Sequence, residues 1–209
     1  MTFASRKDAG NRLGRLLRDE GMEVDLVLGL PRGGVVVAAE DARVLQRPLD
    51  VLVVRKIGHP WYREFAVGAL AEPDVVVLDQ DSLSRNPVNR AQLEGVIAEE
   101  TGRLQQYRAQ FHRGGPPRLA GKIIGLVDDG LATGATMEAA VRAAKKQDAL
   151  SVIVAVPVAS AHAMQRLEGV ANNVLALFVD EDFQAVGQYY AEFSQTSDEE
   201  VLALLRSSP

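Results

Sequence analysis

The stretch IIGLVDDGLATGAT at residues 123–136 decides the fold and the candidate site of this chain. An apolar run ends in Asp128 and Asp129, and a loop of small residues then leads into a helical stretch. Ligands of open α/β sheets bind at the carboxyl ends of strands, and the free N–H groups of a helix N-terminus suit a phosphate. The segment therefore predicts a ribose 5-phosphate site, with the sugar hydroxyls on the two carboxylates. The loop residues predicted to surround the phosphate are Ala132, Thr133, Gly134, Ala135 and Thr136.

A simpler reading of this segment is an ordinary strand, turn and helix in which an Asp caps the helix. A cap needs one Asp, whereas this segment also carries a second acid and a small-residue loop with two threonines. A Walker A loop is excluded, because the Gly-Lys-Ser/Thr ending is missing.

Short apolar runs alternate with helical stretches on both sides of this segment. Strands that are apolar throughout and separated by helices are typical of a parallel sheet covered on both faces. We therefore expect an α/β fold with a mainly parallel, twisted sheet flanked by helices, in a single domain spanning 1–209. Strands are expected at 25–31, 50–55, 65–71, 74–78, 122–127, 151–158 and 173–179, and helices at 5–20, 35–42, 87–111, 136–146 and from 161.

Composition limits the classes of function. Of the 209 residues, 47% are hydrophobic and 24% are charged, which is ordinary for a globular protein. The absence of cysteine excludes disulfides and thiolate metal sites, and a net charge of −5 argues against a nucleic-acid-binding surface. There is no run of about 18 apolar residues, and the charged N-terminus lacks the apolar core of a signal peptide. We therefore expect a cytoplasmic protein that binds neither nucleic acid nor membranes.

The segment 123–136 resembles the motif with which type I phosphoribosyltransferases bind 5-phosphoribosyl-1-pyrophosphate (PRPP). That motif is an apolar strand, two acids, two variable positions, a small residue and Thr-Gly-x-Thr; the version here is especially similar to the adenine type. The resemblance implies transfer of ribose 5-phosphate from PRPP to a nitrogenous acceptor, such as a nucleobase, with release of pyrophosphate. It also implies catalytic roles for Asp128 and Asp129, Mg²⁺ held by both through water, and a homodimer.

Two further segments resemble the parts of this family that bind pyrophosphate. The loop LGLPRGG at 28–34 ends an early strand and would offer glycine amides and a guanidinium, although Arg-Gly-Gly alone is also an ordinary turn. A basic pair after the next strand resembles one that reaches the pyrophosphate in orotate-type members; the alternative is a solvated strand end. The predicted pyrophosphate ligands are Pro31, Arg32, Gly33, Gly34, Arg55 and Lys56.

The family carries a small hood over the acceptor, and the two ends of this chain are its candidates. The tail at 178–190 resembles the hood of 6-oxopurine members, in which an aromatic ring stacks on the base just before a Val-Gly pair. Phe183 is the candidate ring, although the match carries one extra residue, and packing in a local core is the alternative. We expect the hood to be built from the N-terminal segment and residues 178–209, with a helical insertion at 80–118.

The chain departs from 6-oxopurine members where those enzymes handle the base. Ala132 replaces the Asp that acts as general base, and the strand at 151–158 lacks the Lys that reads the exocyclic oxygen. Adenine-type members use a loop acid for the proton, a role that Glu64 or Glu72 could fill here. A hydrolase of PRPP or of a nucleotide, and a non-catalytic PRPP-binding regulator, therefore stay open as alternative functions.

Overall fold

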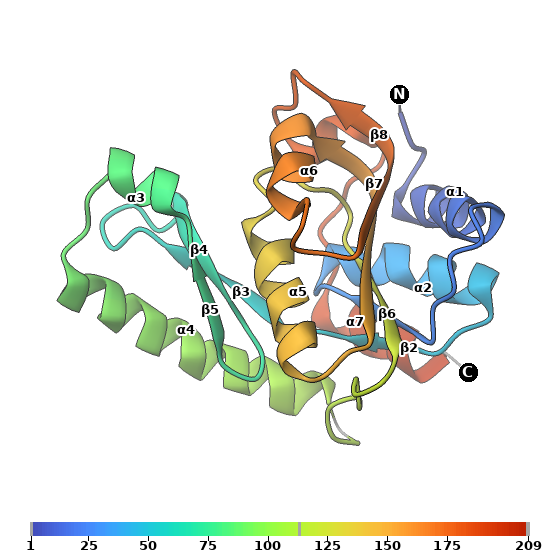
Figure 1. The fold of residues 1–209 in the computed structure, drawn as a ribbon, viewed down its shortest axis with the longest axis horizontal. Coiled ribbons are helices and arrows are strands. Elements are labelled where there is room, and N and C mark those ends of the chain that lie inside the picture. Colours follow the sequence, from blue (N-terminus) through green and yellow to red (C-terminus); the bar gives the residue numbers. More distant parts are fainter. Residues whose placement is uncertain (1, 113, 208–209) are drawn as a thin grey trace.

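The centre of the computed structural model, which describes residues 2–112 and 114–207, is a five-stranded parallel sheet (Figure 1). Residues 1, 113 and 208–209 of the predicted segments lie outside the described part. Every neighbouring pair of strands in this sheet is parallel. This confirms the expected α/β fold with a mainly parallel sheet. Its strand order is β2 (Leu49–Val51), β1 (Leu26–Gly29), β6 (Ile123–Val127), β7 (Ser151–Ser160) and β8 (Asn173–Asp180).

Helices cover both faces of the parallel sheet (Figure 1). α1 (Arg6–Asp19) and α2 (Gly33–Leu45) lie on one face, and α5 (Ala135–Lys146) and α6 (Ala161–Leu167) lie on the other. α7 (Asp198–Ser207) packs on α2, and a short 3-10 helix, η1 (Val186–Tyr189), precedes it. Within residues 2–112 and 114–207, no helix has the length and apolarity needed to cross a membrane.

The strands of the parallel sheet are apolar throughout because the core lies on both of their faces. In β7, Val152, Val154 and Val156 belong to the core under α5 and α6, while Ile153 and Ala155 belong to the core under α1 and α2. Burying a Val or Ile side chain stabilises a protein by about 1.5–3 kcal/mol. The alternating side chains therefore hold the strand in one register and place its carboxyl end beside that of β6.

An antiparallel sheet of three strands forms a lobe beside this core (Figure 1). Its order is β3 (Val54–Gly58), β4 (Ala66–Ala71) and β5 (Val75–Leu78). The chain continues into α3 (Gln80–Arg85) and α4 (Arg90–Phe111), and α4 packs along β3 and β4. The lobe matters for function because β3 and α4 face the carboxyl ends of β1 and β6 across a cleft.

The expectation of one strand at 50–55 is wrong, because the chain divides this segment between the two sheets. β2 ends at Val51, and β3 begins at Val54 in the antiparallel sheet. Leu52 N still donates a hydrogen bond to Gly29 O of the parallel sheet at 3.2 Å, whereas Val53 O accepts one from Glu72 N at 3.0 Å. The strands expected at 65–71 and 74–78 do form, as the hairpin β4–β5, but they too lie outside the parallel sheet.

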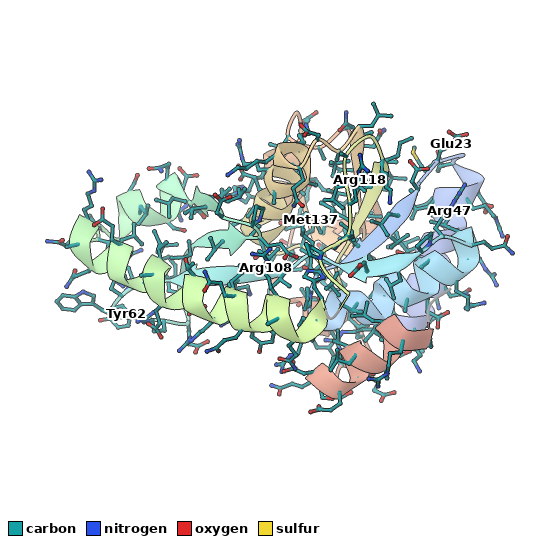
Figure 2. The ribbon with its side chains drawn as sticks, turned by 90° about the horizontal axis from the view of Figure 1, so that it is seen from below. Glu23, Arg47, Tyr62, Arg108, Arg118 and Met137 are labelled. Carbon is teal, nitrogen blue, oxygen red and sulfur yellow. The ribbon has the colours of Figure 1, made fainter. Side chains whose placement is uncertain are left out.

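A buried cluster of charged side chains ties the end of α4 to the junction between the two sheets. The Glu72 carboxylate accepts a hydrogen bond from Val53 N at 2.8 Å and lies 2.8 Å from both Arg108 Nε and His112 Nε2. Figure 2 shows Arg108 at this junction. Burial lowers the pKa of His112, but the carboxylates of Asp50 and Glu72 outweigh this effect and raise the pKa to about 9.

Replacing this imidazole should cost stability in a pH-dependent way. Since the pKa of His112 rises on folding from 6.5 to about 9, its contribution is complete below pH 6.5 and is lost as the pH rises through about 9. His112→Gln should therefore lower the free energy of unfolding by roughly 2–3 kcal/mol near pH 6, and by much less near pH 10. Urea denaturation at both pH values measures this, with the exposed His162→Gln as control. A loss that is equal at both pH values would contradict the prediction.

Candidate active site

The two acids of the segment 123–136 lie directly after β6, at the carboxyl end of the parallel sheet. Asp128 Oδ1 accepts a hydrogen bond from Asp129 N at 2.8 Å, and both residues line the cleft between core and lobe. Burial and the neighbouring charge of Asp129 raise the pKa of Asp128, while Lys56 and Arg6 act in the opposite direction. The pair is therefore a shared acidic centre that faces cations from other parts of the chain.

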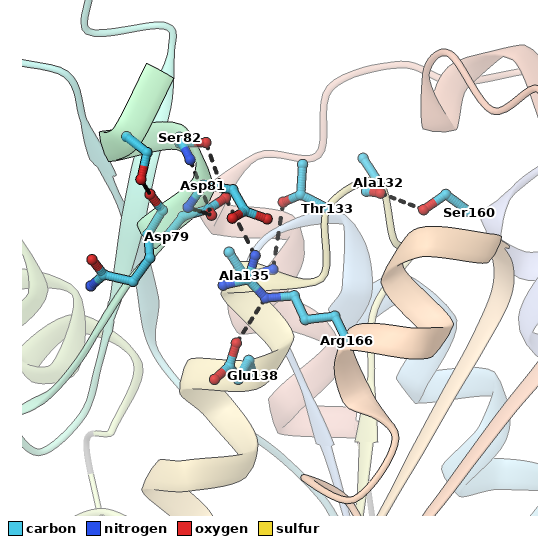
Figure 3. A network of polar contacts seen from close by, with 11 residues as sticks. Asp79, Asp81, Ser82, Ala132, Thr133, Ala135, Glu138, Ser160 and Arg166 are labelled. Atoms are coloured by element: carbon cyan, nitrogen blue, oxygen red, sulfur yellow. Dashed lines mark hydrogen bonds and ion pairs between the residues drawn. The ribbon is translucent and has the colours of Figure 1, made fainter. Parts of the chain in front are cut away.

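The small-residue loop that follows leads into α5, and contacts with the end of β7 fix its position (Figure 3). Leu131 forms an isolated parallel bridge with Ala159, and Ser160 Oγ donates a hydrogen bond to Ala132 O at 2.6 Å. Gly134 has a φ of 75°, a left-handed conformation that glycine adopts without steric cost, so the chain turns here into the first N–H groups of α5. Exposed Ala132 and Thr133 and half-buried Thr136 leave this helix start accessible to an anion.

An arginine from α6 supports the same helix start, which the sequence did not indicate. Arg166 Nε donates to Glu138 Oε2 on α5 at 2.7 Å, and its Nη1 lies 3.3 Å from Asp79 Oδ2, the residue that caps α3 (Figure 3). A Cβ placed on Gly134 would contact the Arg166 side chain at 3.4 Å. Arg166 therefore ties the predicted phosphate loop to the lobe and adds a cation beside it.

The predicted pyrophosphate loop lies against the two acids. A Cβ on Gly34 would come within 2.7 Å of Asp128 Oδ1, and one on Gly33 would collide with Asp129 Oδ2. Only residues without a side chain allow this approach. The loop leads directly into α2, and its Pro31–Arg32 peptide is cis. Pro31, Arg32 and Gly33 line the cleft.

The basic pair Arg55 and Lys56 reaches the cleft from the lobe, on β3. Arg55 Nε donates to Glu100 Oε2 of α4 at 3.0 Å, and Glu100 Oε1 accepts from Arg103 Nη1 at 2.8 Å. Arg103 Nη2 in turn lies 2.7 Å from Glu99 Oε1, and Arg63 Nη2 donates to Glu99 Oε2 at 2.6 Å. A chain of alternating charges therefore runs along this wall of the cleft and orients Arg55.

We expect the pyrophosphate affinity to depend on Glu100, which is only 5% exposed. Glu100→Gln removes the charge that holds Arg55 and Arg103, so titration with Mg²⁺-pyrophosphate should show roughly three- to tenfold weaker binding. Glu94→Gln is the matched control, because Glu94 lies on the same helix and pairs with Arg90 in solvent. Equal affinities for the two variants would show that Arg55 does not rely on this network.

Two residues from the ends of the chain also reach the acids, and the sequence pointed to neither. Arg6, at the start of α1, donates from Nε to Asp129 Oδ2 at 2.8 Å. Tyr190 donates from its hydroxyl to Asp129 O at 2.6 Å. Phe3 pairs with Tyr190 in an isolated bridge, so the N-terminal segment and the tail pack together over this corner of the site.

The remaining candidates lie in different places. Phe183 packs on Tyr189, with ring centroids 5.2 Å apart, and does not line the cleft, so its base-binding role stays a prediction. Glu64 lines the cleft. Glu72 is 3% exposed and serves the buried cluster described above, so the expectation that it could handle the proton of the acceptor is wrong.

The acid pair after β6, the loop before α2, β3 and α4 surround one cleft of about 640 Å³. They lie far apart in the sequence and meet only because β1 and β6 are neighbours in the sheet and the lobe folds over their carboxyl ends. The charged and hydroxyl side chains on the cleft walls are Arg32, Arg55, Lys56, Arg63, Glu64, Glu99, Glu100, Arg103, Tyr107, Asp128, Asp129 and Thr136.

The oxygen donors of this cleft suit a Mg²⁺ ion that also binds a ligand, rather than a metal ion that is held by protein side chains alone. Asp128 and Asp129 supply carboxylates, and Mg²⁺ typically binds one or two carboxylates together with water and substrate phosphates. Residues 2–112 and 114–207 contain no cluster of three or more His, Cys, Asp or Glu side chains that could hold a metal ion. The donor set therefore fits a metal that is completed by a phosphate-bearing ligand.

Known proteins with similar sequences point to one family. The family model for the phosphoribosyl transferase domain matches residues 5–192. A Mycobacterium tuberculosis protein that is provisionally named a phosphoribosyl transferase is 44% identical over 204 residues, which make up 97% of this chain and 46% of that protein. The chain thus spans about half the length of the curated relatives it matches.

Solved structures share the fold. A protein from Thermus thermophilus superposes with a TM-score of 0.80 at 44% identity, covering 98% of both chains. A purine phosphoribosyltransferase from Pyrococcus horikoshii has a TM-score of 0.50 at 18% identity, covering 94% of this chain and 96% of that one, which shows a common fold. With a family model that spans nearly all of its length, the chain belongs to the phosphoribosyl transferase domain family.

Proposed function

We propose that this chain is a phosphoribosyltransferase that moves the ribose 5-phosphate of PRPP to a nitrogenous acceptor and releases pyrophosphate. The observation that carries the proposal is the convergence of the predicted motif segments on one cleft. The acids after β6, the glycine loop before α2 and the basic pair on β3 each suit a different part of PRPP. The family membership of the chain supports the same reaction.

The core side of the cleft would bind the sugar phosphate. The first N–H groups of α5, with the hydroxyls of Thr133 and Thr136, would hold the 5′-phosphate at the positive end of the helix dipole. Asp128 and Asp129 would accept hydrogen bonds from the ribose hydroxyls and stabilise positive charge at the anomeric carbon. Positioning the acceptor nitrogen near C1′ then supplies much of the rate acceleration.

The lobe side would bind the leaving group. Arg32, Arg55 and Lys56 would surround the pyrophosphate as the bond between C1′ and its oxygen breaks and the electron pair moves onto that oxygen. Asp128 and Asp129 would hold Mg²⁺ through water, and the bound metal neutralises negative charge on the phosphates.

The acceptor is proposed to be a nucleobase, in a nucleotide-salvage role. Glu64 is the carboxylate of the 58–64 loop that lines the cleft, and it would take the proton that the acceptor nitrogen loses. Ala132, exposed at the loop tip, leaves the position of the 6-oxopurine general base empty of any acid, which favours an acceptor other than hypoxanthine or guanine.

The test is calorimetric titration with PRPP and Mg²⁺, followed by pyrophosphate release against a panel of purine and pyrimidine bases. Binding with release only in the presence of a base supports the transferase and identifies the acceptor. Release without a base would instead indicate a hydrolase, and tight PRPP binding without release would indicate a regulator. Absence of PRPP binding would overturn the proposal.

We also propose that the chain acts as a cytoplasmic homodimer. Trp61 and Tyr62, in the 58–64 loop of the lobe, are 71% and 72% exposed, which is unusual for large aromatic side chains and suits a contact between copies. Figure 2 shows Tyr62 at the outer end of the lobe. Light scattering of the wild type and of Trp61→Ser tests this. A monomeric wild type would contradict it.

A further inference from the structure

Arg6 stands out because it is a nearly buried cation in contact with one of the two acids. Its side chain is 12% exposed, and the Asp129 side chain that it pairs with is 16% exposed. Nη1 donates to Ser194 O at 2.7 Å, and the guanidinium carbon lies 3.8 Å above the ring of Phe193. The tail of the chain therefore holds this guanidinium in one orientation against Asp129.

Helix stability does not explain an arginine at this position. Arg6 is the first residue of α1, directly after the capping Ser5, and a cation there opposes the positive end of the helix dipole. The residue also lies beside the pyrophosphate loop, since a Cβ on Gly33 would come within 2.8 Å of Arg6 Nε. Arg6 therefore contacts the place where the glycine loop before α2 lies against the acid pair.

We propose that Arg6 is a positioning residue of the reaction, which holds the Asp129 carboxylate by one oxygen and so directs the other oxygen toward a ribose hydroxyl of PRPP. The inference rests on the proposed function. Arg6 contacts Oδ2 through Nε, and Asp129 still lines the cleft, so the ion pair orients the carboxylate without covering it. Tyr190 holds the carbonyl of the same residue, which fixes its backbone as well.

In this arrangement, residues near both ends of the chain fix the carboxylate that is proposed to bind the sugar. Ser194 and Phe193 of the tail hold Arg6, which lies near the N-terminus, and Arg6 in turn pairs with Asp129. While Arg6 holds Oδ2 at 2.8 Å, the carboxylate keeps one orientation on the wall of the cleft. Loss of Arg6 should therefore weaken PRPP binding by releasing Asp129, and should leave the fold intact.

The experiment compares Arg6→Gln and Arg6→Lys with Arg15→Gln, an exposed arginine on the same helix. Calorimetric titration with PRPP and Mg²⁺ should show about tenfold weaker binding for Arg6→Gln and substantial recovery for Arg6→Lys, which restores the charge. In turnover, KM for PRPP should rise more than kcat falls, because the acceptor side of the site is untouched. Arg15→Gln should match the wild type.

A double-mutant cycle separates positioning from a general structural role. In an Asp129→Asn background, Arg6→Gln should have little further effect on PRPP affinity, because Arg6 acts through that carboxylate. Additive losses, unchanged affinity in Arg6→Gln, or tighter binding would each overturn the inference. If the wild type itself fails to bind PRPP, the proposed function fails first, so the two failures are distinguishable.

Discussion

Asp129→Asn is expected to lower turnover by about 10²–10³-fold while the protein stays folded. Asparagine keeps the shape of the side chain but loses the negative charge that would stabilise a cationic ribosyl centre. The fold tolerates the change, because Arg6 retains its contacts with Ser194 O and the ring of Phe193.

Pyrophosphate release measures the expected loss of turnover, and thermal unfolding tests whether the variant stays folded. Asp19→Asn is the matched control, since that carboxylate is 66% exposed and pairs with Arg18 at the far end of α1. Turnover of Asp129→Asn equal to that of the wild type would remove Asp129 from the catalytic site.

Gly34→Ala should have the second largest effect, because the added methyl group meets backbone atoms as well as the Asp128 side chain. Its Cβ would lie 2.9 Å from both Asp128 Cα and Val127 O, at the point where β6 ends. Relief of this clash must displace either the glycine loop before α2 or the acid pair. We expect PRPP affinity to fall at least about tenfold and the free energy of unfolding to fall by about 1–3 kcal/mol.

The control for this variant is Gly102→Ala, within α4. A Cβ there meets no atom within 4 Å, and alanine favours a helix interior over glycine by roughly 0.5–1 kcal/mol, so this variant should gain stability. Titration with PRPP and chemical denaturation of both variants measure the effects. Wild-type affinity in Gly34→Ala would show that the close approach of the loop to Asp128 is not needed for binding.

Local sequence patterns predicted the elements whose residue types and spacing are distinctive by themselves. The segment 123–136 combines an apolar strand, paired acids and a small-residue loop, and each part has a physical role that depends on near neighbours in the chain. Continuous apolar runs likewise predicted the strands of the parallel sheet, because burial on both faces removes alternation. The same rule failed at 50–55, where every hydrophobic position stays buried although the chain passes from one sheet to the other.

By itself, the sequence determined the fold class, and it predicted a site built from the acid pair, the small-residue loop after it, and the glycine and basic segments. Only the tertiary structure placed Arg6 and Tyr190 on Asp129, Arg166 beside the small-residue loop at the start of α5, and Glu72 in a structural cluster. The physical reason is that such contacts join residues far apart in the chain. An isolated arginine or glutamate has no periodicity or spacing that marks it, so its role follows from the packing that brings its partner within reach.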